Sequence, residues 1–122
     1  MNQRKFDLEN RLINHAVEIV KFYDFLKPTK PAIHLGGQII RSGTSPALNY
    51  GEANAAESKR DFIHKMKVCL KELRETYNCL RIIDAADLHD NQDKVKILLI
   101  ECNELISIFV TSIKTSMKNN NG

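Results

Sequence analysis

The chain has 122 residues, 43% of them hydrophobic and 27% charged, which is typical of one compact domain and leaves no room for a second domain with its own core. Its net charge of +3 is too small for the whole surface to attract nucleic acid, so such binding would require a local cluster of cations. The three cysteines, Cys69, Cys79 and Cys102, lack CxxC spacing and lie in apolar patterns, which argues against a disulfide framework or a zinc site.

The first helix is predicted from about Asn10 to Lys27, because apolar residues recur there three and four positions apart. Its buried face is expected to hold Leu12, Ala16, Ile19, Tyr23 and Leu26, with Ile13 and Val20 beside them. Pro28 and Pro31 follow too closely for regular structure, so residues 27–31 are predicted to form a short connector.

The second helical region begins near Ala32, and Pro46 leaves two interpretations of it open. In the first, one helix over residues 33–56 is kinked at Pro46, whose missing amide frees the carbonyl four residues earlier. In the second, Gly43 ends one helix and Ser45 caps another that begins with Pro46, as in a helix-turn-helix. Small residues at every fourth position would let a neighbouring helix approach closely; they are Gly43, Ala47, Gly51 and Ala55.

The third helix is predicted to begin after a cap formed by Ser58 and to end near Ala86. A heptad register places an inward stripe at Phe62, Met66, Cys69, Leu73, Thr76, Leu80 and Ile83, widened by Ile63, Leu70 and Tyr77. The same register places cations on the outer face. We call these residues the basic ladder: Arg60, His64, Lys67, Lys71, Arg74 and Arg81.

The basic ladder has two interpretations. It is a contact surface for the phosphate backbone of nucleic acid, where cations replace counterions. Alternatively, it is a solvated helix surface whose charges pair within the helix, as Asp61 with Lys65 and Lys71 with Glu75.

A fourth helix is predicted from about Asp93 to Lys118, after a turn and cap in the segment LHDNQD. Its apolar seam holds Val95, Leu99, Cys102, Ile106, Phe109 and Ile113. Three isoleucines fall on the side that should face water, and we expect them to meet another subunit: Ile97, Ile100 and Ile108. Charged and amide residues interrupt the run too often for a membrane span, and the tail over about residues 116–122 is expected to fray.

The four segments predict an all-α protein, an antiparallel up-down-up-down four-helix bundle forming a single domain over residues 1–122. The stretch from Gln38 to Glu75 resembles the 23S ribosomal RNA intervening-sequence proteins. Their pattern has an arginine and serine, a run of small residues, Asn-Ile-Ala-Glu-Gly, and a Phe-containing amphipathic helix. The matching residues are Arg41, Ser42, Ser45, Asn49, Glu52 and Phe62. Where the pattern has Asn-Ile-Ala-Glu-Gly, the chain reads Asn-Tyr-Gly-Glu-Ala and so departs from it at three of five positions.

The resemblance covers the middle third of the chain by motif and nearly all of it by helix pattern. It implies a bacterial protein that forms a ring-shaped homopentamer. Related accessory proteins of diversity-generating retroelements bind nucleic acid and a reverse transcriptase through basic surfaces, so the resemblance also implies RNA, DNA or such a protein as partners. None of the matching residues forms a catalytic pattern.

The sequence contains no recognisable catalytic, cofactor or metal-binding pattern. Asp61 and His64 come nearest to a Glu-x-x-His metal motif, but the register places both on the outer face. The histidines are dispersed and are expected at the surface or at its boundary: His15, His34, His64 and His89. Gly36, Gly37 and Gly43 lack the Lys-Ser/Thr pair of a phosphate loop.

The expected function is the binding of structured RNA or DNA by an oligomeric, non-enzymatic protein that requires no cofactor. A cytoplasmic location is expected, because MNQRKFDLENRL has charges where a signal peptide has its apolar core. Two alternatives stay open. One is a structural or protein-interaction scaffold whose basic ladder only keeps the assembly soluble. The other is a helix-turn-helix DNA binder with residues 46–56 as recognition helix, although that segment has no Lys or Arg to meet phosphates.

Overall fold

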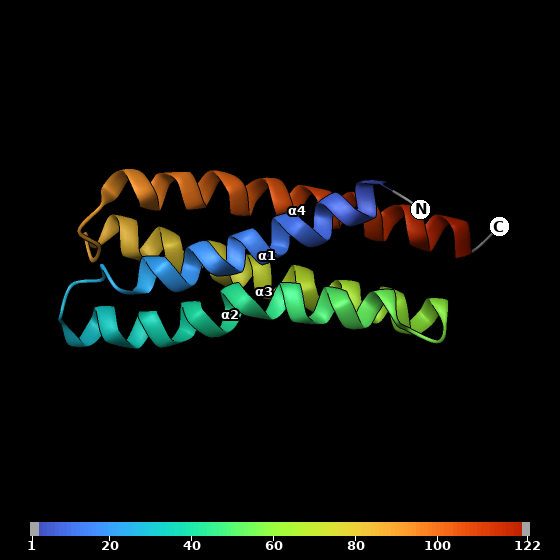
Figure 1. The fold of residues 1–122 in the computed structure, drawn as a ribbon, viewed down its shortest axis with the longest axis horizontal. Coiled ribbons are helices and arrows are strands. Elements are labelled where there is room, and N and C mark those ends of the chain that lie inside the picture. The colour runs from blue at the N-terminus through green and yellow to red at the C-terminus, as the bar shows by residue number, and fades with distance from the viewer. Residues whose placement is uncertain (1–2, 121–122) are drawn as a thin grey trace.

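Four helices make up the part of the chain that the computed structural model describes, residues 3–120, with side chains described for residues 7–119. They are α1 (Gln3–Tyr23), α2 (Lys30–Asn54), α3 (Lys59–Ala85) and α4 (Gln92–Asn120). Consecutive helices run in opposite directions and pack side by side, and α4 closes the bundle against α1 with the least extensive contact (Figure 1). The predicted antiparallel four-helix bundle is confirmed.

The core is formed by the inward faces of all four helices. On α3 the predicted stripe is buried at Met66, Cys69, Leu73, Thr76, Leu80 and Ile83. The inner face of α1 differs from the prediction, since His15 and Phe22 are buried while Ile13, Val20 and Tyr23 are exposed. Because apolar residues surround α1 on several sides, their spacing alone does not decide which side faces the core.

α2 continues through Pro46 as one helix. The interpretation with a turn at Gly43 is therefore wrong, and with it the helix-turn-helix DNA binder. Proline removes one backbone donor from the ladder of helix hydrogen bonds, and the Thr44 hydroxyl bonds the Ile40 carbonyl at 2.7 Å in the turn just before it. Pro46 and Ser42 are both buried, so tertiary packing stabilises the helix across this position.

Two glycines allow α1 and α2 to approach closely. A Cβ atom on Gly43 would lie 2.8 Å from Ile19 Cγ2, and one on Gly36 would lie 2.8 Å from the Tyr23 ring. By contrast, nothing lies within 4 Å of such an atom on Gly51, and Ala55 is exposed. The predicted ridge of small residues holds at Gly43 and at Ala47, which packs against the core, and is wrong at Gly51 and Ala55, because the end of α2 turns that side toward solvent.

The α1–α2 connector lies earlier than predicted. α1 ends at Tyr23, and the Thr29 side chain caps α2 by accepting a hydrogen bond from the Ala32 amide at 3.3 Å. Pro31 belongs to the first turn of α2, where its missing amide has no helix partner to lose. A Thr cap followed by proline indicates the start of a helix. The prediction of a connector treats both prolines as helix breakers and so places the start of α2 too late.

His89 joins the two loops at one end of the bundle. Its ring stacks on Phe22 with centroids 3.9 Å apart, its Nε2 lies 2.9 Å from the Phe22 carbonyl oxygen, and its Nδ1 accepts the Asn91 amide at 2.9 Å. The backbone of Lys27 also donates to the Leu88 carbonyl at 2.8 Å. The expectation of a surface or boundary position is therefore wrong for His89.

α4 begins after a cap formed by Asn91 and is the longest of the four described helices. The Asn91 side chain accepts a hydrogen bond from the Lys94 amide at 3.1 Å, which confirms the predicted cap. The helix continues to Asn120, two residues beyond its predicted end, and residues 121–122 of the tail that is expected to fray lie outside the described part. The segment has no Gly or Pro before residue 122, and Lys118 in the last turn suits the helix dipole.

Candidate nucleic-acid interface

The basic ladder lies on the outer face of α3, as the heptad register predicts. All six side chains are exposed, and Arg60 and Arg81 at its ends are separated by about 31 Å along the helix axis. Among residues 7–119, no carboxylate lies within ion-pair distance of any of the six. The five Lys and Arg side chains of the ladder are therefore not directly neutralised by the described side chains.

Partners from α2 take up two of the side chains expected to pair within α3. Glu75 pairs with Arg41 of α2, and Lys65 pairs with Glu52 of α2 at 2.9 Å. The predicted pairs Asp61–Lys65 and Lys71–Glu75 do not form. The reason is that Lys65 and Glu75 lie on the side of α3 that faces α2, where partners from another helix reach them.

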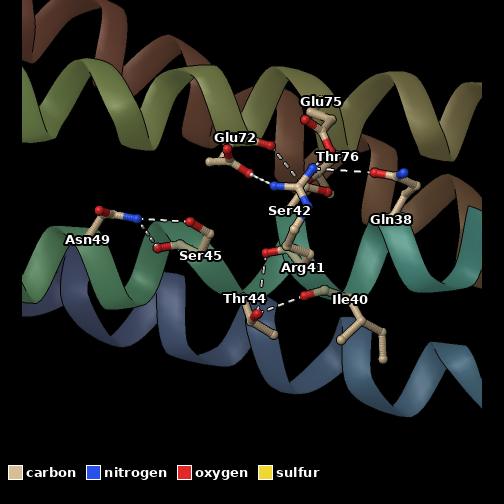
Figure 2. A network of polar contacts seen from close by, with 10 residues as sticks. All are labelled: Gln38, Ile40, Arg41, Ser42, Thr44, Ser45, Asn49, Glu72, Glu75 and Thr76. Carbon is tan, nitrogen blue, oxygen red and sulfur yellow. Dashed lines mark hydrogen bonds and ion pairs between the residues drawn. The ribbon is translucent and has the colours of Figure 1, made fainter.

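Arg41 and Ser42 attach α2 to α3 (Figure 2). The Arg41 guanidinium donates from Nη1 to Glu72 Oε2 at 3.0 Å and from Nη2 to Glu75. Next to it, the hydroxyls of Ser42 and Thr76 are joined by a hydrogen bond of 2.9 Å in the core. Glu72 is only 8% exposed, so a cation beside it is required to keep its charge from being buried without compensation.

Comparison with known families identifies the relationship. The model of the 23S rRNA-intervening sequence proteins matches residues 4–111. The chain belongs to this family. A crystal structure of a protein with unknown function, from the S23 ribosomal protein family of Bacteroides thetaiotaomicron VPI-5482, is similar to it with a TM-score of 0.80 and 30% sequence identity, over 88% of this chain and 98% of that one. Curated proteins gave no match.

The residues that carry the resemblance to the intervening-sequence proteins have structural partners. Arg41 and Ser42 bind α3 as described, Glu52 pairs with Lys65, and Asn49 Nδ2 donates to Ser45 Oγ at 2.8 Å. Phe62 packs against the core at the start of α3. Arg41, Ser42 and Glu52 of the motif therefore join α2 to α3, Asn49 bonds within α2, and the ladder cations belong to a different face.

The predicted oligomer contacts on α4 are only partly outward. Ile97 and Ile100 are 59% and 62% exposed. Ile108 is half-buried and lines a hollow of about 840 Å³ with Leu8 and Arg11 of α1. Ile108 is therefore less exposed than Ile97 and Ile100, because the beginning of α1 lies beside the far half of α4.

His15 is a buried titratable residue whose burial the sequence did not predict. It is 2% exposed, neither ring nitrogen has a hydrogen-bond partner, and burial lowers its pKa to about 4 against a smaller opposing effect of Glu101. The expectation of a boundary position is wrong here too. Its position in the sequence indicates burial, because His15 lies at helical spacing from the buried residues Leu12, Ile19 and Phe22.

The remaining chemistry of the described residues is that of a packed core. Burial raises the pKa of Cys69 and of Cys102 to about 12, which keeps both thiols protonated at neutral pH. Within residues 7–119, no three His, Cys, Asp or Glu side chains come together as ligands for a metal ion. None of the four described helices is both long and apolar enough to cross a membrane.

Proposed function

We propose that this intervening-sequence protein is a non-enzymatic, cytoplasmic homo-oligomer that binds the phosphate backbone of structured RNA or DNA through the basic ladder. The proposal rests on one observation: the ladder cations are exposed and, among residues 7–119, lack a carboxylate within ion-pair distance. Cations of this kind release counterions when phosphates replace them, and this release drives binding without sequence preference.

The absence of aromatic residues from the ladder favours folded or double-stranded nucleic acid. Proteins that bind unpaired bases stack them on aromatic side chains, and the ladder contains only Arg, Lys and His. Contacts to the phosphate backbone position a protein on a duplex but carry no base information. The ligand is therefore chosen by shape and charge rather than by sequence.

The test compares two triple variants with the same change of charge. Arg60→Glu, Lys67→Glu and Arg74→Glu together remove the centre of the ladder, while Lys30→Glu, Lys114→Glu and Lys118→Glu change exposed lysines of α2 and α4. Binding to labelled structured RNA and duplex DNA at low salt should fall at least 100-fold, by about 3 kcal/mol or more, in the ladder variant and far less in the matched one. Equal losses in both would reject the ladder and indicate attraction by net charge alone.

The second candidate function is a protein-interaction scaffold. It is favoured by Ile97 and Ile100, because exposed large apolar side chains that adjoin one another mark interaction surfaces. In this case the partner is a protein, such as a reverse transcriptase or further copies of the chain, and the ladder keeps the assembly soluble. Absence of nucleic-acid binding at low salt by a correctly folded protein would favour this candidate.

A further inference from the structure

The hollow of about 840 Å³ lies at the end of the bundle where α1 begins and α4 ends. It forms because α1 crosses the bundle at an angle. The last turns of α1 pack on α2 at Gly36 and Gly43, whereas its beginning lies beside the end of α4 (Figure 1). The beginning of α1 and the last turns of α2 therefore diverge. We call the space between them the terminal hollow; its lining includes Leu8, Tyr50, Asn54, Phe62, Met66 and Thr111.

The floor of the terminal hollow is apolar and held in place by the core. Tyr50 and Met66 are 4% and 1% exposed, and the Tyr50 ring packs edge-on against Phe109 with centroids 5.9 Å apart. Leu8 and Phe62 pack against the same core. Aromatic and apolar side chains that are fixed in this way form a surface ready to receive the flat face of a ring.

Asn54 adds a polar group to this apolar floor. Its Oδ1 is buried and, among residues 7–119, has no hydrogen-bond partner. A buried amide oxygen is costly to leave unpaired. The terminal amide of asparagine rotates over a broad range, so a donor placed in the terminal hollow can meet this oxygen. The site therefore favours a ligand with an N–H group on its ring.

One wall of the terminal hollow is formed by hydroxyl groups of α4. Five Ser and Thr residues line it at helical spacing: Ser107, Thr111, Ser112, Thr115 and Ser116. The exposed Asp7 of α1 also belongs to the lining. Hydroxyls and a carboxylate are suited to bind the hydroxyls of a sugar, as an acidic residue binds ribose in dinucleotide sites.

The charges of the described lining favour an uncharged ligand. Arg11 is the only cation among the lining residues, and its guanidinium is already held by Glu101 at 2.7 Å and Glu104 at 3.3 Å. A phosphate group in the terminal hollow would meet Asp7 instead of a free cation. Burying a charge without a partner is costly, so a phosphorylated ligand is disfavoured.

We infer that the terminal hollow binds an unphosphorylated nucleoside. The base lies on Tyr50 and Phe62, an N–H group of the base donates to Asn54 Oδ1, and the sugar hydroxyls meet the hydroxyl wall of α4. A flat ring, an N–H donor and a hydroxylated sugar are the three parts that the floor, the amide and the wall accept. This site is separate from the basic ladder, which lies on the outer face of α3, so the inference goes beyond the proposed function.

The test compares adenosine with purine riboside, which lacks the amino group on the base. Calorimetry should give a Kd of about 1 mM or lower for adenosine. Asn54→Leu should weaken adenosine binding about 5- to 10-fold, because the hydrogen bond to the amino group is lost, and should leave purine riboside binding nearly unchanged. The matched control is Asn103→Leu, at an exposed residue of α4 outside the lining, which should change neither.

A second variant fills the terminal hollow. Ser112→Phe places a ring in the space that the base would occupy and should abolish binding of both nucleosides, while circular dichroism shows unchanged helix content. Asn54→Leu should also fold normally, since it removes a buried oxygen that has no partner. Absence of adenosine binding at about 5 mM, equal losses of both nucleosides in Asn54→Leu, or unchanged binding in Ser112→Phe would each overturn the assignment.

Adenosine monophosphate tests whether the ligand must be uncharged. It is measured in the triple variant Arg60→Glu, Lys67→Glu, Arg74→Glu, so that the ladder cannot hold its phosphate. It should bind no more tightly than adenosine. Tighter binding that Ser112→Phe abolishes would overturn the uncharged class of ligand. Adenosine should bind this triple variant as it binds the unaltered protein, whatever the result for structured RNA and duplex DNA, so failure of the nucleoside site and failure of the proposed function are distinguishable.

Discussion

Arg41 of α2 holds Glu72 of α3 at 3.0 Å, at a point where the carboxylate is only 8% exposed (Figure 2). The guanidinium itself is half exposed and also reaches Glu75. One arginine thus neutralises two carboxylates on the side of α3 that faces α2. Arg41 is therefore a structural cation of the α2–α3 interface, whereas the ladder cations lie on the neighbouring face of α3.

Arg41→Ala should lower the free energy of unfolding by about 1–2 kcal/mol, because Glu72 is left buried without its partner and Arg41 is partly exposed to water. Glu72→Gln in the same chain should recover about half of the loss, since a neutral amide needs no cation. Urea denaturation of the single and double variants measures the coupling. Additive effects would show that the two side chains do not stabilise each other.

Two glycine substitutions in α2 should have opposite effects. Gly43→Ala brings a methyl group against the rigid Ile19 side chain and should cost about 1–3 kcal/mol of unfolding free energy. Gly51→Ala enters open space and should stabilise by about 0.5–1 kcal/mol through helix propensity. Thermal unfolding of both variants checks this. Destabilisation of similar size by both substitutions would show that the two positions do not differ in how closely they approach α1.

His15 should make the bundle sensitive to acid. Burial lowers its pKa from 6.5 to about 4, so between these values the unfolded chain takes up a proton that the folded chain does not. The unfolding free energy should therefore fall as the pH drops through this window, by about 3 kcal/mol in total, and its contribution is fully present above pH 6.5.

His15→Leu removes this dependence and the two unpaired ring nitrogens. The difference in unfolding free energy between this variant and the unaltered protein should grow steadily from pH 7 to pH 4. Other titrating groups cancel in the difference. A difference that does not change with pH would show that His15 is accessible to protons in the folded state.

The fold could be predicted where apolar spacing and caps agree. The inward stripe of α3 is regular over several heptads, and Ser58 and Asn91 mark helix starts by ordinary capping chemistry. α1 is different because Ile13, Val17 and Val20 make its outer side as apolar as its inner side. When a second apolar surface exists, periodicity cannot tell a core from an interface.

The candidate site could be predicted only in part. Exposure of the basic ladder follows directly from the register of α3. Its lack of neutralising carboxylates does not, because Glu75 lies at a suitable spacing for Lys71 and is removed only by Arg41, far away in the chain. Contacts between helices decide such competitions, and a single sequence holds no record of them.

His89 should be one of the most sensitive positions for stability. His89→Ala removes the stacking on Phe22 and both ring hydrogen bonds and should cost about 2–4 kcal/mol. His89→Phe keeps the stacking and should cost less, about 1–3 kcal/mol, through the unpaired Phe22 carbonyl and Asn91 amide. Calorimetry gives the order. A larger loss for the phenylalanine variant would mean that ring size, rather than hydrogen bonding, limits this site.

The salt dependence of nucleic-acid binding should report how many ladder cations contact phosphates. Each phosphate contact contributes about −0.9 to the slope of log K against log salt on duplex DNA, so Arg74→Gln should reduce the slope by about 1. Arg41→Gln and Lys114→Gln are the controls, since Arg41 is occupied by Glu72 and Glu75 and Lys114 lies on α4. Both should leave the slope unchanged, although Arg41→Gln lowers stability. A slope that falls equally for all three variants would show that binding follows net charge, whereas a slope that falls for Arg74 alone assigns the phosphate contact to the outer face of α3.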